Sequence, residues 1–215
     1  MRWTRQVFAA AGVAAAVAVS MTVTACDPVN PSLTTIAGVG SDTTQEVMGN
    51  IAAAYNGENK SKFPGFIGSY DAFPAPNKPA NIVTKNGCPS IARPQGSGAG
   101  ITALLNDTTG CIDFARSSRG KKTDGTEDGL VLFAYGRDGL TVATFGTTNA
   151  PTNLTTSQLN DIYTCAVTNW HDIDATKPSA TIHPFLPQAG SGTRSFFLTA
   201  IGVSAPGSCV DDSVE

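Results

Sequence analysis

Glycines and hydroxyl side chains alternate in a short stretch that has the chemistry of an anion site. Gly190-Ser191-Gly192-Thr193 follows an apolar run at residues 181–186 that is typical of a strand, and precedes a helical run at residues 195–201. A turn of small residues that opens a helix leaves backbone N–H groups free, and the helix dipole adds partial positive charge. Ser191 and Thr193 add hydroxyl donors, and Arg194 adds a charged fork. This indicates an oxyanion cradle, although an ordinary helix N-cap is the alternative for one such turn.

The pattern occurs twice more in the chain. Gly96-Ser97-Gly98-Ala99-Gly100 precedes an apolar helix start at residues 101–105, and Gly38-Val39-Gly40-Ser41-Asp42-Thr43 connects a strand signal to a helix signal. Three strand-to-helix turns of this kind predict that several helix N-termini converge on one anion, with Ser41, Thr43 and Ser97 among the donors.

Composition limits the class of protein. The chain has 215 residues and a formal net charge of −3, and charged residues make up only 14% of it, so a basic nucleic-acid surface is not indicated. The 22 glycines and 13 prolines suit a loop-rich α/β protein of one large or two small domains.

The N-terminus has the pattern of an export signal. Arg2 and Arg5 precede an apolar run at residues 7–19, which is short for a membrane span, so residues 1–25 are predicted to be a signal peptide. Val23-Thr24-Ala25-Cys26 resembles the bacterial lipobox, which predicts lipidation of Cys26 and attachment to the outer face of the cytoplasmic membrane. Plain secretion after cleavage near Ala25 is the alternative. Residues 26–33 are expected to form a tether.

The remaining cysteines are even in number: Cys88, Cys111, Cys165 and Cys209. In an exported chain this predicts two disulfides, with three possible pairings. We favour Cys88–Cys111 and Cys165–Cys209 because each pair then lies within one predicted lobe. The chain has no CxxC motif and only two histidines, so we expect neither a metal nor a cofactor.

Strand and helix signals alternate along the chain, which predicts parallel α/β layering. Strands are expected at residues 34–39, 66–70 and 111–115, and helices at residues 46–55, 101–105 and from 155 onward. Residues 71–95 should form a long loop held by a disulfide. Two β-rich runs at residues 130–135 and 140–145 are expected to cross between a first lobe, residues 34–138, and a second lobe, residues 139–215.

Taken in order, these motifs resemble the phosphate-binding substrate-binding proteins of ABC transporters, which have a two-lobed periplasmic-binding-protein-like (type II) architecture. The matching motifs are Gly38-Val39-Gly40-Ser41, Gly96-Ser97-Gly98-Ala99-Gly100, Ile112-Asp113-Phe114-Ala115, residues 154–163 with Asn169-Trp170, and Gly190-Ser191-Gly192-Thr193. The resemblance implies two α/β lobes, phosphate or a similar oxyanion in the cleft, hinge closure, and an ABC permease as partner. It implies binding without catalysis.

The resemblance also implies a ligand set. Ser97 matches a ligand serine of the family, and Ser191, Gly192 and Thr193 match the ligand turn of the second lobe. The first-lobe turn of the family corresponds to Asp42 and Thr43.

Two positions depart from the family. Ser118 stands where the family usually has an aspartate that accepts a proton from hydrogen phosphate, and Pro187 stands where an arginine is usual. Arg194 or Arg116 is then expected to supply the positive charge. Asp42 has two interpretations that stay open: a relocated proton acceptor, or an N-cap carboxylate.

Family members usually continue well beyond the length of this chain, so we expect a truncated sequence with an incomplete second lobe. Two other functions are alternatives. One is a surface interaction protein that has this fold without transport. The other is a hydrolase with Ser97 or Ser191 as nucleophile and His171 or His183 as base, although neither serine has the Gly-x-Ser-x-Gly surroundings of a nucleophile elbow.

Overall fold

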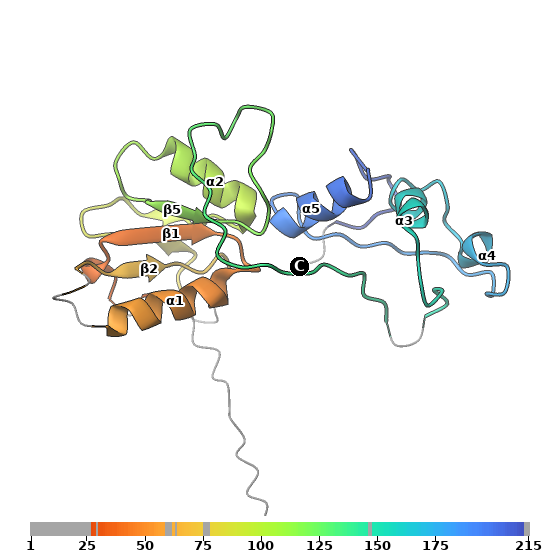
Figure 1. Cartoon of the computed structure of the whole chain (residues 1–215), viewed down its shortest axis with the longest axis horizontal. Coiled ribbons are helices and arrows are strands. Elements are labelled where there is room, and N and C mark those ends of the chain that lie inside the picture. Colours follow the sequence, from red (N-terminus) through yellow and green to blue (C-terminus); the bar gives the residue numbers. More distant parts are fainter. Residues whose placement is uncertain are drawn as a thin grey trace, which may run out of the picture.

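The chain forms two bodies joined by an extended segment in a computed structural model (Figure 1). The structure describes residues 27–28, 30–58, 62, 64–74, 78–145 and 148–212. The predicted signal peptide and Cys26 lie outside these residues. Each body has its own apolar core: Ala37, Val39, Tyr70, Ile82 and Ile112 in the first, and Ile162, Tyr163, Ile182, Leu186, Ile201 and Val203 in the second.

A parallel sheet organises the first lobe. It has the order β2-β1-β5, in which β1 (Ile36–Gly40) pairs with β2 (Ile67–Ser69) on one side and with β5 (Phe114–Arg116) on the other. The central strand β1 is buried from Ala37 onward, as expected for a strand covered on both faces. The three predicted strands are therefore present, with ends shifted by a few residues.

Two helices cover this sheet. Helix α1 (Gln45–Gly57) packs along β2, and α2 (Gly96–Asn106) packs on β5 and β1. Figure 1 shows them on opposite sides of the sheet. Both were predicted, although α2 begins five residues earlier than expected, since the glycine-serine stretch is itself the first turn of the helix.

The predicted long loop contains a small antiparallel hairpin, β3 (Asn81–Ile82) with β4 (Ile91–Ala92). Its turn is joined to the segment before β5 by the Cys88–Cys111 disulfide, and Cys165–Cys209 is the disulfide of the second lobe. The favoured pairing is thus confirmed.

The second lobe has three helices among its described residues: α3 (Thr156–Tyr163), α4 (Trp170–Ile173) and α5 (Gly192–Ala200). A capping box between Thr155 and Gln158 starts α3, and Tyr163 packs edge-to-face on Phe197 of α5 at 4.9 Å between ring centroids. The strand expected at residues 181–186 is wrong: this stretch runs extended and makes only isolated bridges.

The crossing segment, residues 130–145, differs most from expectation. Neither predicted strand forms, because the segment has no ladder partner among the described residues. Its apolar side chains are therefore exposed: Val131 by 77%, Phe133 by 81% and Phe145 by 82%. Among the described residues, no helix is long and apolar enough to cross a membrane.

The start of the described chain is fixed to the first lobe rather than extended as a free tether. The Asp27 carboxylate accepts two hydrogen bonds from Arg93, at 2.9 and 2.6 Å, and one from the Asp71 N–H at 2.8 Å. Lys78 lies 3.3 Å away. Burial acts to raise the pKa of the Asp27 carboxyl, but hydrogen bonds and charge from Arg93, with smaller help from Lys78, hold that pKa below its usual range.

We expect Asp27→Asn to lower the free energy of unfolding by about 3 kcal/mol at pH 7, because it leaves a buried arginine without its counter-charge. The contribution of Asp27 is present above its unfolded-state pKa of 3.8 and is lost as pH falls through the lower folded-state pKa. Urea unfolding of the wild type, the variant and an exposed control, Asp138→Asn, measures this. A difference that persists undiminished to pH 2 would contradict the assignment.

Candidate functional site

Close backbone contacts hold α2 against the end of β1. Strand β1 ends at Gly40, whose φ of +116° lies in the region that favours glycine. A Cβ at Gly40 would lie 2.6 Å from the Arg116 carbonyl oxygen, and one at Gly100 would overlap Gly40 itself. The α2 backbone can approach the end of β1 this closely because both contacting residues, Gly40 and Gly100, lack a side chain.

A second close contact joins the two lobes. The Gly98 N–H of α2 donates to the Gly190 carbonyl oxygen at 3.1 Å, and a Cβ at Gly96 would lie 2.7 Å from the same oxygen. Helices α2 and α5 therefore meet at their N-termini, as Figure 1 shows at the junction of the two bodies. The turns that open α2 and α5 thus meet.

Hydroxyl groups fill the space between these turns. The Ser97 and Ser118 Oγ atoms are 3.3 Å apart, and Thr43 Oγ1 of the first lobe lies 3.2 Å from Thr193 Oγ1 of the second. Gly192 lies against both serines, since a Cβ there would overlap their hydroxyls. Of the predicted residues, the structure thus brings Thr43, Ser97, Ser118, Gly192 and Thr193 together.

Ser191 is buried and caps α5, because its Oγ accepts the Arg194 N–H at 3.3 Å. Both interpretations of this turn, N-cap and cradle, are compatible with that bond. Ser41 is fully buried at the start of the α1 turn, and its Oγ has no hydrogen-bond partner among the described residues.

Unpartnered polar atoms concentrate at this place. Five buried side-chain atoms of the described residues have no hydrogen-bond partner, and four of them belong to the turns before α1 and α5: Ser41 Oγ, Asp42 Oδ1, Thr44 Oγ1 and Gln188 Nε2. Buried polar groups are normally hydrogen-bonded to protein or to water, so these four atoms are available to water molecules or to a ligand. Gln188 was missed by the sequence analysis, and its place two residues before Gly190 was the available signal.

Arg116 does not face an anion, which corrects the first of the two expected cations. Its side chain is 1% exposed, and all five of its N–H donors are used. They bind Ser69 Oγ and four carbonyl oxygens, those of Gly38, Gly40, Ser41 and Tyr70, at 2.7–3.4 Å. Arg116 therefore holds the ends of β1 and β2 in place beneath the turn.

Arg194 is also directed elsewhere. Its Nη1 pairs with Asp212 at 2.9 Å and donates to the Pro187 carbonyl oxygen at 3.0 Å. Its guanidinium stabilises the loop before α5, and its contribution to the turn is the backbone N–H that Ser191 caps.

The loop that carries Ser118 is held by an ion pair that the sequence analysis did not identify. Arg119 and Glu127 form two hydrogen bonds, at 3.1 and 2.6 Å, and both side chains are less than 10% exposed. The hydrogen bonds from Arg119, together with one from the Lys122 N–H, hold the pKa of Glu127 below its usual range although burial acts against this. Ser118 is thereby kept beside Ser97.

The two candidate bases of a serine hydrolase, His171 and His183, have other surroundings. His171 Nδ1 lies 2.8 Å from the Lys177 carbonyl oxygen, and His183 is exposed. Among the described residues, no hydrogen bond links either histidine to Ser97 or Ser191, so neither serine has a base. The described residues also contain no group of side chains that could hold a metal ion.

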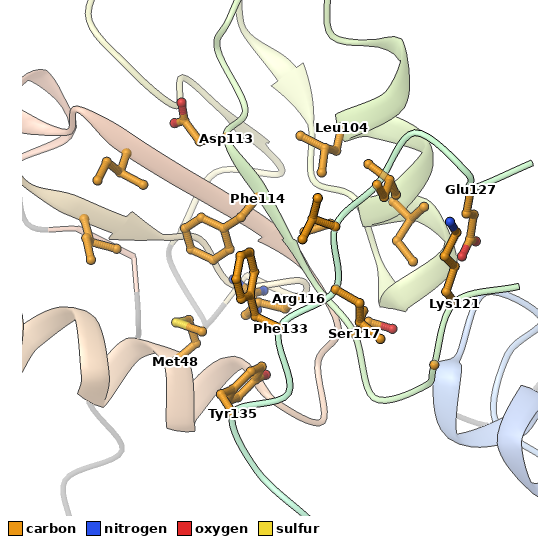
Figure 2. A pocket seen from close by; sticks show the side chains of 18 residues that line it. Met48, Leu104, Asp113, Phe114, Arg116, Ser117, Lys121, Glu127, Phe133 and Tyr135 are labelled. Carbon is orange, nitrogen blue, oxygen red and sulfur yellow. The ribbon is translucent and has the colours of Figure 1, made fainter.

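A separate apolar cavity of about 400 Å³ lies beside β5 (Figure 2). Figure 2 shows Phe133 and Tyr135 of the crossing segment with Phe114 of β5 and Met48 of α1 around it. Arg116 is the one predicted site residue in its lining, so this cavity is distinct from the meeting point of the turns.

Comparison with known proteins gives one family. A family model described as "PBP superfamily domain" matches residues 27–211. Two curated relatives are named "Phosphate-binding protein PstS". The one from Staphylococcus epidermidis is 30% identical over 105 residues, which cover 47% of this chain and 32% of the relative; the one from Staphylococcus saprophyticus is 29% identical over 112 residues, covering 49% and 34%. The chain thus spans about a third of the length of these relatives.

Two solved structures share the fold at 22% identity. One is an ABC-type phosphate transport receptor from Vibrio cholerae, with a TM-score of 0.50. The matched region covers 83% of this chain and 63% of the receptor's chain. The other is a putative phosphate ABC transporter substrate-binding protein with bound phosphate from Clostridium perfringens, with a TM-score of 0.52 and coverage of 83% and 61%.

We expect Arg116→Lys to lower the free energy of unfolding by about 3 kcal/mol, because an ammonium group with three donors cannot replace a planar fork that serves five buried acceptors. The charge is unchanged, so the loss reports geometry. Urea unfolding measures it, with Arg137→Lys on the exposed crossing segment as the matched control. Equal unfolding midpoints for the two variants would refute the role assigned to Arg116.

Proposed function

This chain belongs to the PBP superfamily, and on that premise we propose that it is a receptor that binds phosphate, or a similar tetrahedral oxyanion, for import by an ABC transporter. The anion binds between the lobes at the N-termini of α1, α2 and α5. The permease receives it, and nothing is chemically transformed.

One observation carries the proposal: the unpartnered buried atoms at the meeting point of the turns. Ser41 Oγ, Thr44 Oγ1 and Gln188 Nε2 can each donate a hydrogen bond, and no acceptor within the described chain uses them. Three helix N-termini add backbone N–H groups and partial positive charge at the same place. Together they form a set of donors for an anion that has several oxygen atoms.

Binding requires the lobes to separate, because the turns contact each other directly. Thr43 touches Thr193, and Gly192 touches Ser97 and Ser118. An anion enters by replacing these hydroxyl contacts with its own oxygens. The crossing segment, which has no ladder partner among the described residues, is the natural hinge for this movement.

The cellular setting follows from the N-terminal pattern. We propose that Cys26 is lipidated and that the receptor acts at the outer face of the cytoplasmic membrane. The adjacent residue, Asp27, is bound to Arg93 of the first lobe, so the anchor connects directly to a folded body. The names of the relatives, and serines that have no base, favour a binding protein over an enzyme.

We expect phosphate to bind the full chain with a dissociation constant in the micromolar range or tighter, and Gly192→Ala to weaken it by about tenfold. A methyl group at Gly192 would overlap the hydroxyls of Ser97 and Ser118 and hold the two turns apart. Isothermal titration calorimetry measures both constants.

The matched control is Gly139→Ala, because nothing lies within 4 Å of a Cβ at that position. Neither glycine has a positive φ, so alanine causes no backbone strain at either site. The absence of phosphate, arsenate and sulfate binding by the folded wild-type chain would refute the proposed function, and equal effects of the two variants would refute the site.

A further inference from the structure

Asp27, the first residue that the structure describes, is fixed at one particular end of the first-lobe sheet. Its carboxylate accepts hydrogen bonds from the Asp71 N–H and from the Arg93 guanidinium. Asp71 comes two residues after the end of β2, and Arg93 comes three residues before the start of α2. Because β1, β2 and β5 are parallel, Asp71 marks the carboxyl end of the sheet.

The run that follows Asp27 crosses the lobe to the opposite end of the sheet. The Thr35 N–H donates to the carbonyl oxygen of Phe66 at 2.9 Å, directly before β2 begins. At the carboxyl end, the Ala72 N–H donates to the side chain of Gln45, the first residue of α1, at 3.0 Å. Asp27 therefore lies beside the end of the lobe at which α1 begins, and the run is held at both of its ends.

This position leaves a lipid on Cys26 almost no length of chain between the bilayer and the folded lobe. Consecutive Cα atoms are about 3.8 Å apart, so such an anchor begins one residue away from the contacts of Asp27. Residues 26–33 as a free tether would instead span up to about 28 Å. The anchored lobe would thus touch the membrane surface at the place where Asp27 is bound.

The charges at this place are compatible with a lipid surface. Arg93 and Lys78 lie 2.6 and 3.3 Å from the same Asp27 oxygen, so the carboxylate is paired with two cations. The Lys78 side chain is 26% exposed, whereas that of Arg93 is 2% exposed. A paired carboxylate with a partly exposed ammonium group beside it does not repel anionic headgroups.

We propose that the lipid anchor holds the first lobe directly on the membrane, with the surface around Asp27, at the carboxyl end of the sheet, against the lipid headgroups. This inference rests on the proposed lipidation of Cys26 and specifies the orientation that follows from it. The start of α1 then lies near the bilayer and the end of α1 points away from it.

The experiment measures energy transfer from a dye on α1 to acceptor dyes on the headgroups of phosphatidylglycerol–phosphatidylcholine vesicles that carry the lipidated full chain. The donor dye is attached at Glu46→Cys in one sample and at Gly57→Cys in the other. Both positions are exposed, and they lie on one face of the helix about 16 Å apart, because 11 residues make close to three turns. We expect the transfer rate to be at least about threefold higher for Glu46→Cys, which marks the anchored end.

The matched control inserts three Gly-Ser pairs between Cys26 and Asp27. The insertion adds a flexible linker of roughly 13 Å and leaves every contact of Asp27 in place. The transfer rate for Glu46→Cys should then fall towards that for Gly57→Cys.

Three results would overturn the proposal: equal transfer rates without the insertion, rates that the insertion does not change, and a full chain that does not bind to the vesicles. Calorimetry with phosphate on the unlabelled chain tests the receptor function separately. A chain that binds phosphate without the expected orientation, or the reverse, therefore shows which of the two proposals has failed.

Discussion

The buried guanidinium of Arg116 ties together the carboxyl ends of three parallel strands. It is the last residue of β5, and its donors bind carbonyl oxygens at the ends of β1 and β2 as well as the Ser69 hydroxyl. In open parallel sheets, ligands bind beyond the carboxyl ends of the strands, where the chain turns into the next helix. Because these ends carry the first-lobe turns, the position of the candidate site depends on this one side chain.

Glycine determines how closely the remaining parts approach. The pair Gly40 and Gly100 sets α2 against the end of β1, and Gly96 and Gly98 of α2 meet Gly190 of the second lobe. These contacts are made by backbone atoms, so a side chain at any of these positions would push the two backbones apart. The same glycines leave room for hydroxyl groups to face each other across the interface, which is how residues 150 positions apart in sequence come into contact.

The sequence alone was sufficient for the turns, the helices that follow them, the three strands of the sheet and the disulfide pairing. These features are local, or follow from dividing the cysteines between lobes.

The sequence was insufficient where a segment's structure depends on residues far away in the chain. Residues 130–145 have β-branched and aromatic side chains suited to strands, but a strand needs a neighbour, and among the described residues none pairs with them. Arg116 was expected to offer its charge to an anion because the strand was predicted to end at residue 115, whereas Arg116 is the last residue of β5 and its side chain is buried. That Gln188 and Thr44 each have a buried atom without a hydrogen-bond partner cannot be read from their neighbours in sequence, because burial depends on the folded chain.

The Cys165–Cys209 disulfide closes a loop of 44 residues that contains the whole Ser191–Thr193 turn. Cross-linking a loop of this length removes conformational entropy from the unfolded chain worth about 4 kcal/mol. The Cys88–Cys111 disulfide likewise closes a loop that contains the Gly96–Gly100 turn, so a reducing compartment would remove a contribution of this kind from each lobe. Two of the three turns thus lie inside disulfide-closed loops, and the turn before α1 does not. Both lobes are therefore expected to reach their full stability only once the chain has been oxidised.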